Sequence, residues 1–483
     1  MKLYRENGTL NYIKLFVLLT AIYVVLVSLF YYASGEELHY RESAGNIEEF
    51  TADNIVGELT TGRRIEQTYE NEICFPEKVG VMLSNYDRGV QGSLLLELYI
   101  ADSGEVLATK QIPAEKIGLN RYEYLEFGSG QRNLHGVLLQ VVLTAEAGEP
   151  GIAPTALYNS KQELKQGNLR IDGEPVNGSL CIAVYGKDEV WTGHHFKELA
   201  VGFFMLLSLL YLLCAWRHAH GKKELFFSTA LAMKKYGFLM EQLVSRDFKV
   251  RYKRSMLGMF WSFLNPLLTM VVQFIVFSQL FKSGIDNVAG YMLSGIVVFN
   301  FFNEAVGQAL GAIVYNASLI TKVYVPKYIY PVTKVMSSCV NFMISLGALF
   351  VVVLFTKEPI TKAFLLLPFL IVCVTLFSIG FGMLLSALMV FFRDIQFLWG
   401  IFSMLWMYLT PLFYPETILA EQYRWIFKCN PMYYYVKFMR SIVLDGVSPE
   451  PRLYILCALF SFGALTVGGL VFKKTQNKFI LNI

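Results

Sequence analysis

One apolar stretch of the sequence, from Tyr291 to Tyr315, carries side chains that could face water inside a membrane. A carboxylate, three carboxamides and two glycines recur there at helical spacing and therefore share one face of a helix. They are Asn300, Asn303, Glu304, Gly307, Gln308 and Gly311. A carboxylate at this depth is costly unless it faces a partner or a wet cavity. Two interpretations of Glu304 stay open: it lines a channel, or it holds together helices that the two glycines let approach closely.

Aromatic residues make up 15% of the chain and crowd its C-terminal half. Most are expected to face lipid or the protein core. Those that face an aqueous path would stack on sugar rings, whose C–H faces are apolar. The aromatic candidates for such a path are Phe260, Trp261, Phe301, Trp406 and Tyr408.

A basic amphipathic helix is predicted from Tyr236 to Arg254. Its apolar residues recur at spacings of three and four, and its cations lie around the rest of the surface. The apolar set is Tyr236, Met240, Leu243, Val244, Phe248 and Tyr252, and the cations are Arg246, Lys249, Arg251, Lys253 and Arg254. Such a helix lies in the membrane interface with its polar face toward the cytoplasm. It is either a simple positive anchor or a coupling surface for a cytoplasmic subunit.

Sequence motifs for catalysis and nucleotide binding are absent. The sequence contains no G-x-x-x-x-G-K-[ST], no H-E-x-x-H and no G-x-S-x-G, and its seven cysteines form no C-x-x-C pair. The histidine pairs His194-His195 and His218/His220 are interpreted as interfacial or solvated side chains. We therefore expect no catalytic residue, no metal site and no cofactor in this chain, so that any energy must come from a partner.

Composition places the chain in a membrane. Of 483 residues, 54% are hydrophobic and 17% charged, whereas soluble proteins carry about 25% charged residues. Residues 34–196 hold 13 Lys and Arg against 25 Asp and Glu, a net charge of −12, and the remainder carries +16. The basic residues flank apolar runs instead of forming one stripe, which argues against nucleic-acid binding.

Eight apolar segments approach the roughly 20 residues that a membrane-spanning helix needs. They are Tyr12–Ala33, Leu199–Trp216, Leu257–Phe281, Tyr291–Tyr315, Pro331–Phe355, Ala363–Phe392, Phe397–Tyr414 and Leu453–Phe472. The flanking Lys and Arg residues place 217–254 and both termini in the cytoplasm. Tyr12–Ala33 is expected to be a retained anchor, with a cleaved signal peptide as the alternative.

The acidic insert, residues 34–196, is predicted to be an extracytoplasmic β-sandwich with a jelly-roll-like fold. Its short apolar runs end in turn residues, and they are Val79–Leu83, Ser93–Ile100, Tyr122–Phe127, Val137–Leu143 and Leu180–Tyr185. Cys74 and Cys181 are either a disulfide or two separate thiols. The insert has three open roles: glycan binding, docking to another envelope protein, or a structural cap. Sugars would stack on Tyr99, Tyr122, Tyr124 and Trp191, with Tyr86 and Tyr158 as further candidates.

Several motifs in the C-terminal half resemble those of type-2 ABC exporter permeases, which export O-antigen, capsule and teichoic-acid polymers. The matching stretches, in order, are 245–253, Leu257-Gly258, 261–266, Phe302-Asn303-Glu304, 319–327, 392–396, Thr410-Pro411, Tyr414-Pro415 and Asn430-Pro431. The resemblance implies six spans per subunit, a homodimer around a central path, and two cytoplasmic ATPase subunits that bind ATP and Mg. It also implies a bacterial inner (plasma) membrane.

The resemblance assigns a role to three segments of this sequence. Helix 236–254 and the loop 316–330 would contact the ATPases, and re-entrant helices between 413 and 451 would form the outer exit. The coupling residues it implies are Arg246, Asp247, Lys249, Arg251, Tyr252, Lys322, Tyr324, Pro326 and Lys327. Val325 and Tyr328 depart from the family pattern, and the first 235 residues have no counterpart in typical members.

The sequence thus predicts a multi-pass α-helical membrane protein of about eight spans with an inserted β-sandwich. Its parts are an anchor (1–33), the extracytoplasmic domain (34–196), a second span (197–217), the interface helix (236–254) and a six-helix exporter domain (255–483). The predicted function is a permease for lipid-linked polysaccharide. The alternatives are export of another amphiphile, such as a lipid or drug, and a membrane-anchored protein of glycan binding or assembly.

Overall fold

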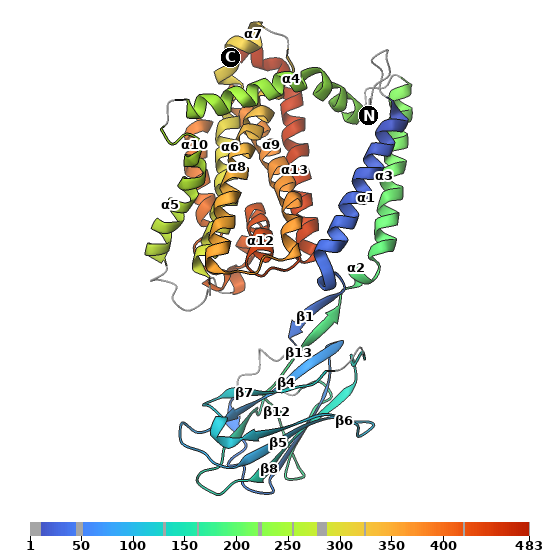
Figure 1. The fold of residues 1–483 in the computed structure, drawn as a ribbon, viewed down its shortest axis with the longest axis vertical. Helices are drawn as coiled ribbons and strands as arrows, with labels where there is room; N and C mark the ends of the chain where they lie inside the picture. The colour runs from blue at the N-terminus through green and yellow to red at the C-terminus, as the bar shows by residue number, and fades with distance from the viewer. Residues whose placement is uncertain are drawn as a thin grey trace. The chain divides into compact units, whose positions relative to one another are not determined.

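The chain folds into two units, seen in a computed structural model (Figure 1). The structure describes residues 11–44, 52–128, 132–161, 164–220, 225–253, 256–277, 287–322, 325–418 and 421–482. One unit is Glu36–Phe196, and the other joins Met1–Gly35 to Lys197–Ile483. Each unit is described by itself below.

The first unit is built from β-strands. In the described ranges they are β1 (Tyr40–Ala44), β2 (Asn54–Ile55), β3 (Arg64–Glu70), β4 (Phe75–Ser84), β5 (Ser93–Ile100), β6 (Val106–Pro113), β7 (Arg121–Glu126), β8 (Leu138–Ala147), β9 (Thr155–Asn159), β10 (Asn168–Ile171), β11 (Glu174–Val176), β12 (Ser179–Leu180) and β13 (Ile182–Glu189). One antiparallel sheet runs β1-β13-β4-β9-β12, with β7 on β4 and β2 on β9, and the other runs β11-β10-β3-β8-β5-β6.

The two sheets share one apolar core. Every second residue of β5, from Leu94 to Ile100, is buried, and β4 contributes Val79, Val81 and Leu83 from the other sheet. This alternation puts one face of each sheet inside, and each fully buried Leu or Val contributes about 1.5–3 kcal/mol. The predicted fold class, helical membrane part plus β domain, is confirmed.

Cys74 and Cys181 are separate thiols in this unit, which resolves the alternative that the sequence left open. Cys181 is completely buried, and this burial raises the pKa of its thiol to about 11.

The second unit is helical. Its helices in the described ranges are α1 (Tyr12–Ser34), α3 (Phe196–Ala219), α4 (Leu225–Tyr252), α5 (Phe260–Phe277), α6 (Val288–Leu310), α7 (Ala317–Lys322), α8 (Ile329–Thr356), α9 (Leu367–Phe391), α10 (Ile395–Tyr408), α11 (Trp425–Lys428), α12 (Pro431–Val443), α13 (Pro451–Thr475) and α14 (Phe479–Asn482); α2 (Trp191–His194) belongs to the β unit. In Figure 1, α6, α8, α9 and α13 run side by side, and α4 crosses their ends.

Five helical segments in the described ranges are long and apolar enough to cross a membrane: Tyr12–Leu38, Phe196–Ala219, Ile329–Thr356, Lys362–Phe391 and Pro451–Asn482. A sixth span results if Val288–Leu310 and Val314–Lys322, bent by 48°, count as one. Two further apolar helices, Phe260–Val276 and Ile395–Tyr408, are shorter. Each of the eight predicted segments therefore corresponds to an apolar helix, and five to six of these meet the length of a full span.

The predicted span Phe397–Tyr414 is wrong at its C-terminal end. Helix α10 stops at Tyr408, and Leu409 is its C-cap. Pro411 follows two residues later and has no N–H to continue the helix, and a proline also disfavours helical geometry at the residue before it. The segment after Tyr408 consequently turns back as short helices.

Glycines bring α9 and α13 into direct backbone contact. A Cβ atom at Gly468 would lie 1.9 Å from the carbonyl oxygen of Gly380, and one at Gly380 would lie 2.3 Å from the backbone of Ala464. Such close approach is typical of small-residue seams between membrane helices. It fixes the packing of the bundle that holds the polar residues described next.

Candidate functional site

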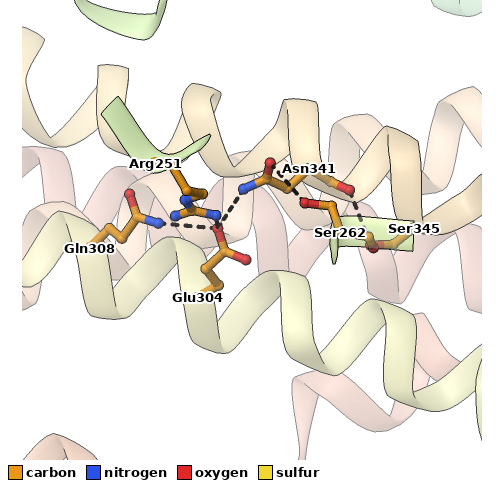
Figure 2. A network of polar contacts seen from close by, with 6 residues as sticks. All are labelled: Arg251, Ser262, Glu304, Gln308, Asn341 and Ser345. Atoms are coloured by element: carbon orange, nitrogen blue, oxygen red, sulfur yellow. Dashed lines mark hydrogen bonds and ion pairs between the residues drawn. The ribbon is translucent and has the colours of Figure 1, made fainter. Parts of the chain in front are cut away.

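A polar network in the bundle is centred on Glu304 of α6 (Figure 2). One carboxylate oxygen, Oε1, accepts hydrogen bonds from Arg251 Nη1 of α4, from Gln308 Nε2 at 3.1 Å and from Asn341 Nδ2 of α8 at 2.9 Å. The Arg251 contact is also an ion pair. A single carboxylate thus connects three helices, and hydrogen bonds to an ionised carboxylate are stronger than those between neutral groups.

The network extends from Asn341 to helix α5. Ser262 Oγ lies 3.5 Å from Asn341 Oδ1, and Ser345 Oγ donates to the carbonyl oxygens of Ser262 and Asn341 at 3.0 and 3.1 Å. The hydroxyl of Ser345 therefore joins α8 to α5. The six residues labelled in Figure 2 come from four helices, α4, α5, α6 and α8, which this network connects.

A cavity of about 350 Å³ lies beside this network. Its wall combines an ion pair, carboxamides and hydroxyls with aromatic faces. The lining residues are Arg251, Trp261, Ser262, Asn265, Pro266, Val297, Asn300, Phe301, Glu304, Ser338, Asn341, Phe342 and Ser345. The rings of Phe301 and Phe342 stack at 4.5 Å. The buried Ser338 Oγ at this wall has no hydrogen-bond partner within the described part of the chain.

Helix α4 is fixed to the bundle at a second point. Asp247 Oδ2 forms an ion pair of 2.7 Å with Lys334 Nζ of α8, and its other oxygen lies 3.0 Å from Arg246. The Asp247 side chain is only 12% exposed. Asp247 and Arg251 are four residues apart and so lie on one face of the helix, which is the face turned toward α6 and α8.

The predicted path residues divide into three groups. Asn300, Phe301, Glu304 and Trp261 line the cavity, and Gln308 bonds to Glu304 beside it. Asn303, Phe260 and Tyr408 are not among the lining residues, and the last two are more than half exposed. Trp406 packs in an aromatic cluster against Phe302, and its indole N–H donates to Asn430. Trp406 is partly buried and does not line the cavity, so its place on a path stays a prediction.

The predicted coupling residues also differ in position. Arg246, Lys249 and Lys322 are exposed, and so is Arg251, although its guanidinium contacts Glu304, whereas Asp247 is largely buried against Lys334. The expectation that Arg251 belongs to the outward polar face needs correction, because its guanidinium pairs with Glu304. Lys327 Nζ donates to the carbonyl oxygen of Gln476 at 2.6 Å and so joins the C-terminal segment. Pro326 is half-buried, and Tyr324 and the side chain of Tyr252 lie outside the described residues.

At the other end of the bundle, the segment after α10 surrounds a buried cation. Arg440 of α12 donates to the carbonyl oxygens of Tyr291, Pro411 and Leu412, and its guanidinium lies 3.4 Å from the centroid of the Tyr291 ring. Asn430 caps α12 by accepting from Met432 N–H and donates to Thr410 Oγ1. The motifs Thr410-Pro411 and Asn430-Pro431 thus contact each other and Arg440 in this segment.

The predicted sugar-stacking residues of the β unit do not form one site. Tyr122 and Tyr124 stack on each other on β7, whereas Tyr99 lies on β5 in the other sheet. Trp191 is 65% exposed on α2 and contacts His195. Tyr86 contacts Arg88 in a turn, and Tyr158 lies on β9.

Sequence reasoning missed the contribution of α8 to the cavity. Ser338, Asn341 and Ser345 are spaced by three and four residues, so the periodicity that identified the α6 stripe would also have found them. Asn265 and Ser262 appeared in the sequence only as members of a motif. Their shared cavity depends on helix packing, which the pattern along one helix does not contain.

A bundle of apolar helices, crossed at one end by a basic helix and containing a polar cavity, is the architecture of a membrane transport domain. Residues 239–444 match the family described as ABC-2 type transporter, so this part of the chain is similar to the membrane domains of that family. The resemblance inferred from the motifs is thereby confirmed.

Curated relatives match the same half of the chain. The O-antigen export system permease protein RfbA of Klebsiella pneumoniae is 29% identical over 249 residues, which is 50% of this chain and 95% of the relative. The protein of the same name from Myxococcus xanthus is 29% identical over 250 residues, covering 51% and 96%. The capsule polysaccharide export inner-membrane protein CtrC of Neisseria meningitidis is 23% identical over 226 residues, covering 45% and 84%.

The N-terminal region is additional to what these relatives share with the chain. A solved structure of an arabinose-bound α-L-arabinofuranosidase covers 31% of this chain and 23% of its own, at 13% identity and a TM-score of 0.13. That score is too low to indicate a common fold.

Proposed function

We propose that this chain is the membrane-spanning permease of an ATP-driven exporter that moves lipid-linked polysaccharide outward across a bacterial inner membrane. The polymer would be of the O-antigen, capsule or teichoic-acid type. The relatives named for O-antigen and capsule export support this assignment, since they align over nearly their whole length. The observation that carries the proposal is the Glu304 network, which joins the basic helix α4 to a cavity within the bundle.

The chemistry of the cavity suits a sugar polymer. Carboxamides and hydroxyls, as at Asn300, Asn341 and Ser338, exchange hydrogen bonds with sugar hydroxyls. The aromatic faces of Trp261, Phe301 and Phe342 offer apolar surfaces to the C–H side of a sugar ring. A site that combines apolar walls with a few placed polar groups is typical of small-molecule and substrate sites.

The energy would come from a separate cytoplasmic ATPase that binds ATP and Mg. In this proposal two such subunits act on a homodimer of this chain, and each contacts the outer face of α4, where Arg246 and Lys249 are exposed. The inner face of the same helix bears Asp247 and Arg251, paired with Lys334 and Glu304. A displacement of α4 by the ATPase would therefore act directly on α6 and α8.

The orientation follows from the flanking charges. Ten Lys and Arg residues between 217 and 254 favour a cytoplasmic location of α4. Residues 34–196, which follow the first span, would then lie outside the inner membrane.

The proposal is tested in the bacterium that produces the chain. Its gene is deleted and replaced by the wild type, by Ser338→Phe or by Val340→Phe. Ser338 is buried at the cavity wall, whereas Val340 is 37% exposed on the outer side of the same helix, so the second variant is a matched control for added bulk. Surface polysaccharide and its intracellular precursor are measured at equal protein levels.

We expect the deletion and Ser338→Phe to lower surface polysaccharide and to accumulate precursor, with Val340→Phe behaving as the wild type. Normal surface polysaccharide in the deletion strain would contradict the proposed function. Normal export by Ser338→Phe would contradict the assignment of the path to this cavity.

A further inference from the structure

Three tyrosine rings gather on the outer face of the seven-stranded sheet of the β unit. The rings of Tyr122 and Tyr124 stack with centroids 6.1 Å apart and an interplanar angle of 28°. Tyr185 of β13 meets Tyr124 edge-on, with centroids at 5.9 Å. We call Tyr122, Tyr124 and Tyr185 the tyrosine platform. All three side chains are half-buried, so part of each remains open to solvent.

The register of the sheet produces the platform. On β4, Val79 and Val81 point into the core, so Lys78, Gly80 and Met82 face outward. Gly80 pairs with Tyr124 of β7 and with Ala183 of β13. Because Gly80 and Ala183 are small, little side-chain volume covers the sheet at this point. Strands β7 and β13 flank β4, so residues distant in the sequence lie side by side on one face.

Because Gly80 has no side chain, the ring of Tyr124 can pack directly against the backbone of β4. A Cβ atom at this position would lie 2.6 Å from a ring carbon of Tyr124 and 3.4 Å from one of Tyr122. Aromatic rings commonly cover a glycine in a neighbouring strand and gain packing from it. Any larger residue at Gly80 would lift Tyr124 and tilt the platform.

Charged groups border the rings. Lys78 Nζ lies 4.8 Å from the ring centroid of Tyr185 and 5.3 Å from that of Tyr124, within cation–π range. Lys110 Nζ donates to the carbonyl oxygen of Tyr124 at 2.6 Å. Burial raises the pKa of Tyr122 to about 12, and a phenol that carries its proton can donate a hydrogen bond.

We propose that the tyrosine platform is a binding site for a saccharide chain of uncharged sugars. Flat aromatic faces match the C–H faces of sugar rings, and the phenols and Lys78 supply donors to the ring hydroxyls. The net charge of −12 over residues 34–196 repels polyanions and anionic membrane surfaces, which selects an uncharged chain over either. The platform is argued from the β unit alone, and only the choice of probe below rests on the proposed function.

The test measures binding by the full chain in detergent micelles. The probe is the uncharged polysaccharide fraction extracted from the surface of the producing cells, titrated by calorimetry. The variants are Tyr124→Ala, Tyr185→Ala and Gly80→Ala, the last of which keeps all three tyrosines and displaces one ring. Tyr99→Ala is the matched control, since it removes a half-buried tyrosine from the other sheet.

We expect the platform variants to weaken binding about tenfold each, the size of one aromatic stacking contact, and Tyr99→Ala to bind as the wild type. Far-UV circular dichroism checks that each variant is folded, and Gly80→Ala decides the question if an alanine at 124 or 185 unfolds the domain. No binding by the wild type, or equal binding by all variants, would overturn the inference. Binding of an envelope protein by the tyrosine platform, without binding of the polysaccharide, would also overturn the inference. Export is assayed separately, so a chain that exports normally without platform binding overturns this inference alone.

Discussion

The ion pair between Arg251 and Glu304 can be tested by a double-mutant cycle. Arg251→Gln and Glu304→Gln each remove one charge and keep a side chain able to form hydrogen bonds. If the pair holds α4 on α6, the two variants must be coupled, because each one already removes the whole interaction.

The magnitude follows from the geometry. Hydrogen bonds to charged groups contribute about 1.5–3 kcal/mol when buried, and exposed ion pairs about 0.2–1 kcal/mol. The side chains of Arg251 and Glu304 are 33% and 36% exposed, which places this pair between the two cases, at about 1 kcal/mol. We expect each single variant to lose about 1 kcal/mol and the double variant to lose about the same, for a coupling of about 1 kcal/mol.

Free energies of unfolding are measured by titrating SDS into mixed micelles of the purified chain. Lys249→Gln with Glu304→Gln is the control cycle, since Lys249 lies on the exposed face of the same helix. Polysaccharide export is measured for all variants in parallel. A double variant that loses the sum of the single losses would refute the reasoning, as would an equal coupling in the control cycle.

Three further outcomes are expected. Arg440→Met removes one donor from three carbonyl oxygens, of which that of Tyr291 still accepts from Ser294 Oγ, and it should cost about 1–3 kcal/mol of stability for each acceptor left unsatisfied, measured by the same SDS titration. Gly468→Ala places a methyl group 1.9 Å from the Gly380 carbonyl oxygen and should cost about 1–3 kcal/mol by overpacking, with Gly469→Ala, where the added Cβ meets open space, as its control. Burial raises the pKa of the Cys181 thiol to about 11 in the folded chain. The neutral thiol therefore contributes its full stabilisation below the pKa of about 8.5 that it has in the unfolded chain, and this contribution is lost as the pH rises toward 11. At pH 8, iodoacetamide should therefore alkylate Cys181 in the denatured chain and spare it in the folded one, by mass spectrometry.

The helical part was predictable because membrane spans carry a long, continuous signal. The apolar runs coincide with helices, and the stripe containing Asn300 and Glu304 does border a cavity. The end of α10 was misplaced because hydropathy continues past Pro411, whereas the backbone cannot continue the helix through it. Hydropathy values describe side chains only, so they carry no information on the backbone N–H group that proline lacks.

The direction that each side chain faces was predicted less well. The periodicity of 236–254 separates an apolar from a basic face, and it assigned Arg251 to the outward face with the other cations. The structure turns this arginine inward because Glu304 offers a partner there. The packing of Trp406 shows the same limit, since its contacts with Phe302 and Asn430 come from segments remote in sequence. Both outcomes depend on contacts between helices remote in sequence.

In the β unit, the predicted runs fall on β4, β5, β7, β8 and β13, whereas other strands were missed, among them the buried β9 and the exposed β10 and β11. β5 coincides with the predicted run Ser93–Ile100, whereas β10 and β11 are short and largely exposed and carry no continuous apolar pattern. Tyr185 was not among the predicted candidates because it meets Tyr124 only through the pairing of β13 and β7 with β4. Strand pairing between segments so far apart cannot be derived from local pattern.

The arrangement of charges on α4 has a mechanical consequence. Its two inward contacts are unequal: Asp247 is nearly buried and bonds to Lys334, whereas Arg251 is a third exposed and shares Glu304 Oε1 with Gln308 and Asn341. A hydrogen bond is lost once its heavy atoms separate beyond about 3.5 Å, so a movement of about 1 Å at the end of α4 would release Arg251. Glu304 would keep its bonds to Gln308 and Asn341, and α6 and α8 would stay joined. The structure therefore leaves the α6–α8 contacts independent of the Arg251 contact, whereas Asp247 holds α4 to α8 through the less exposed ion pair.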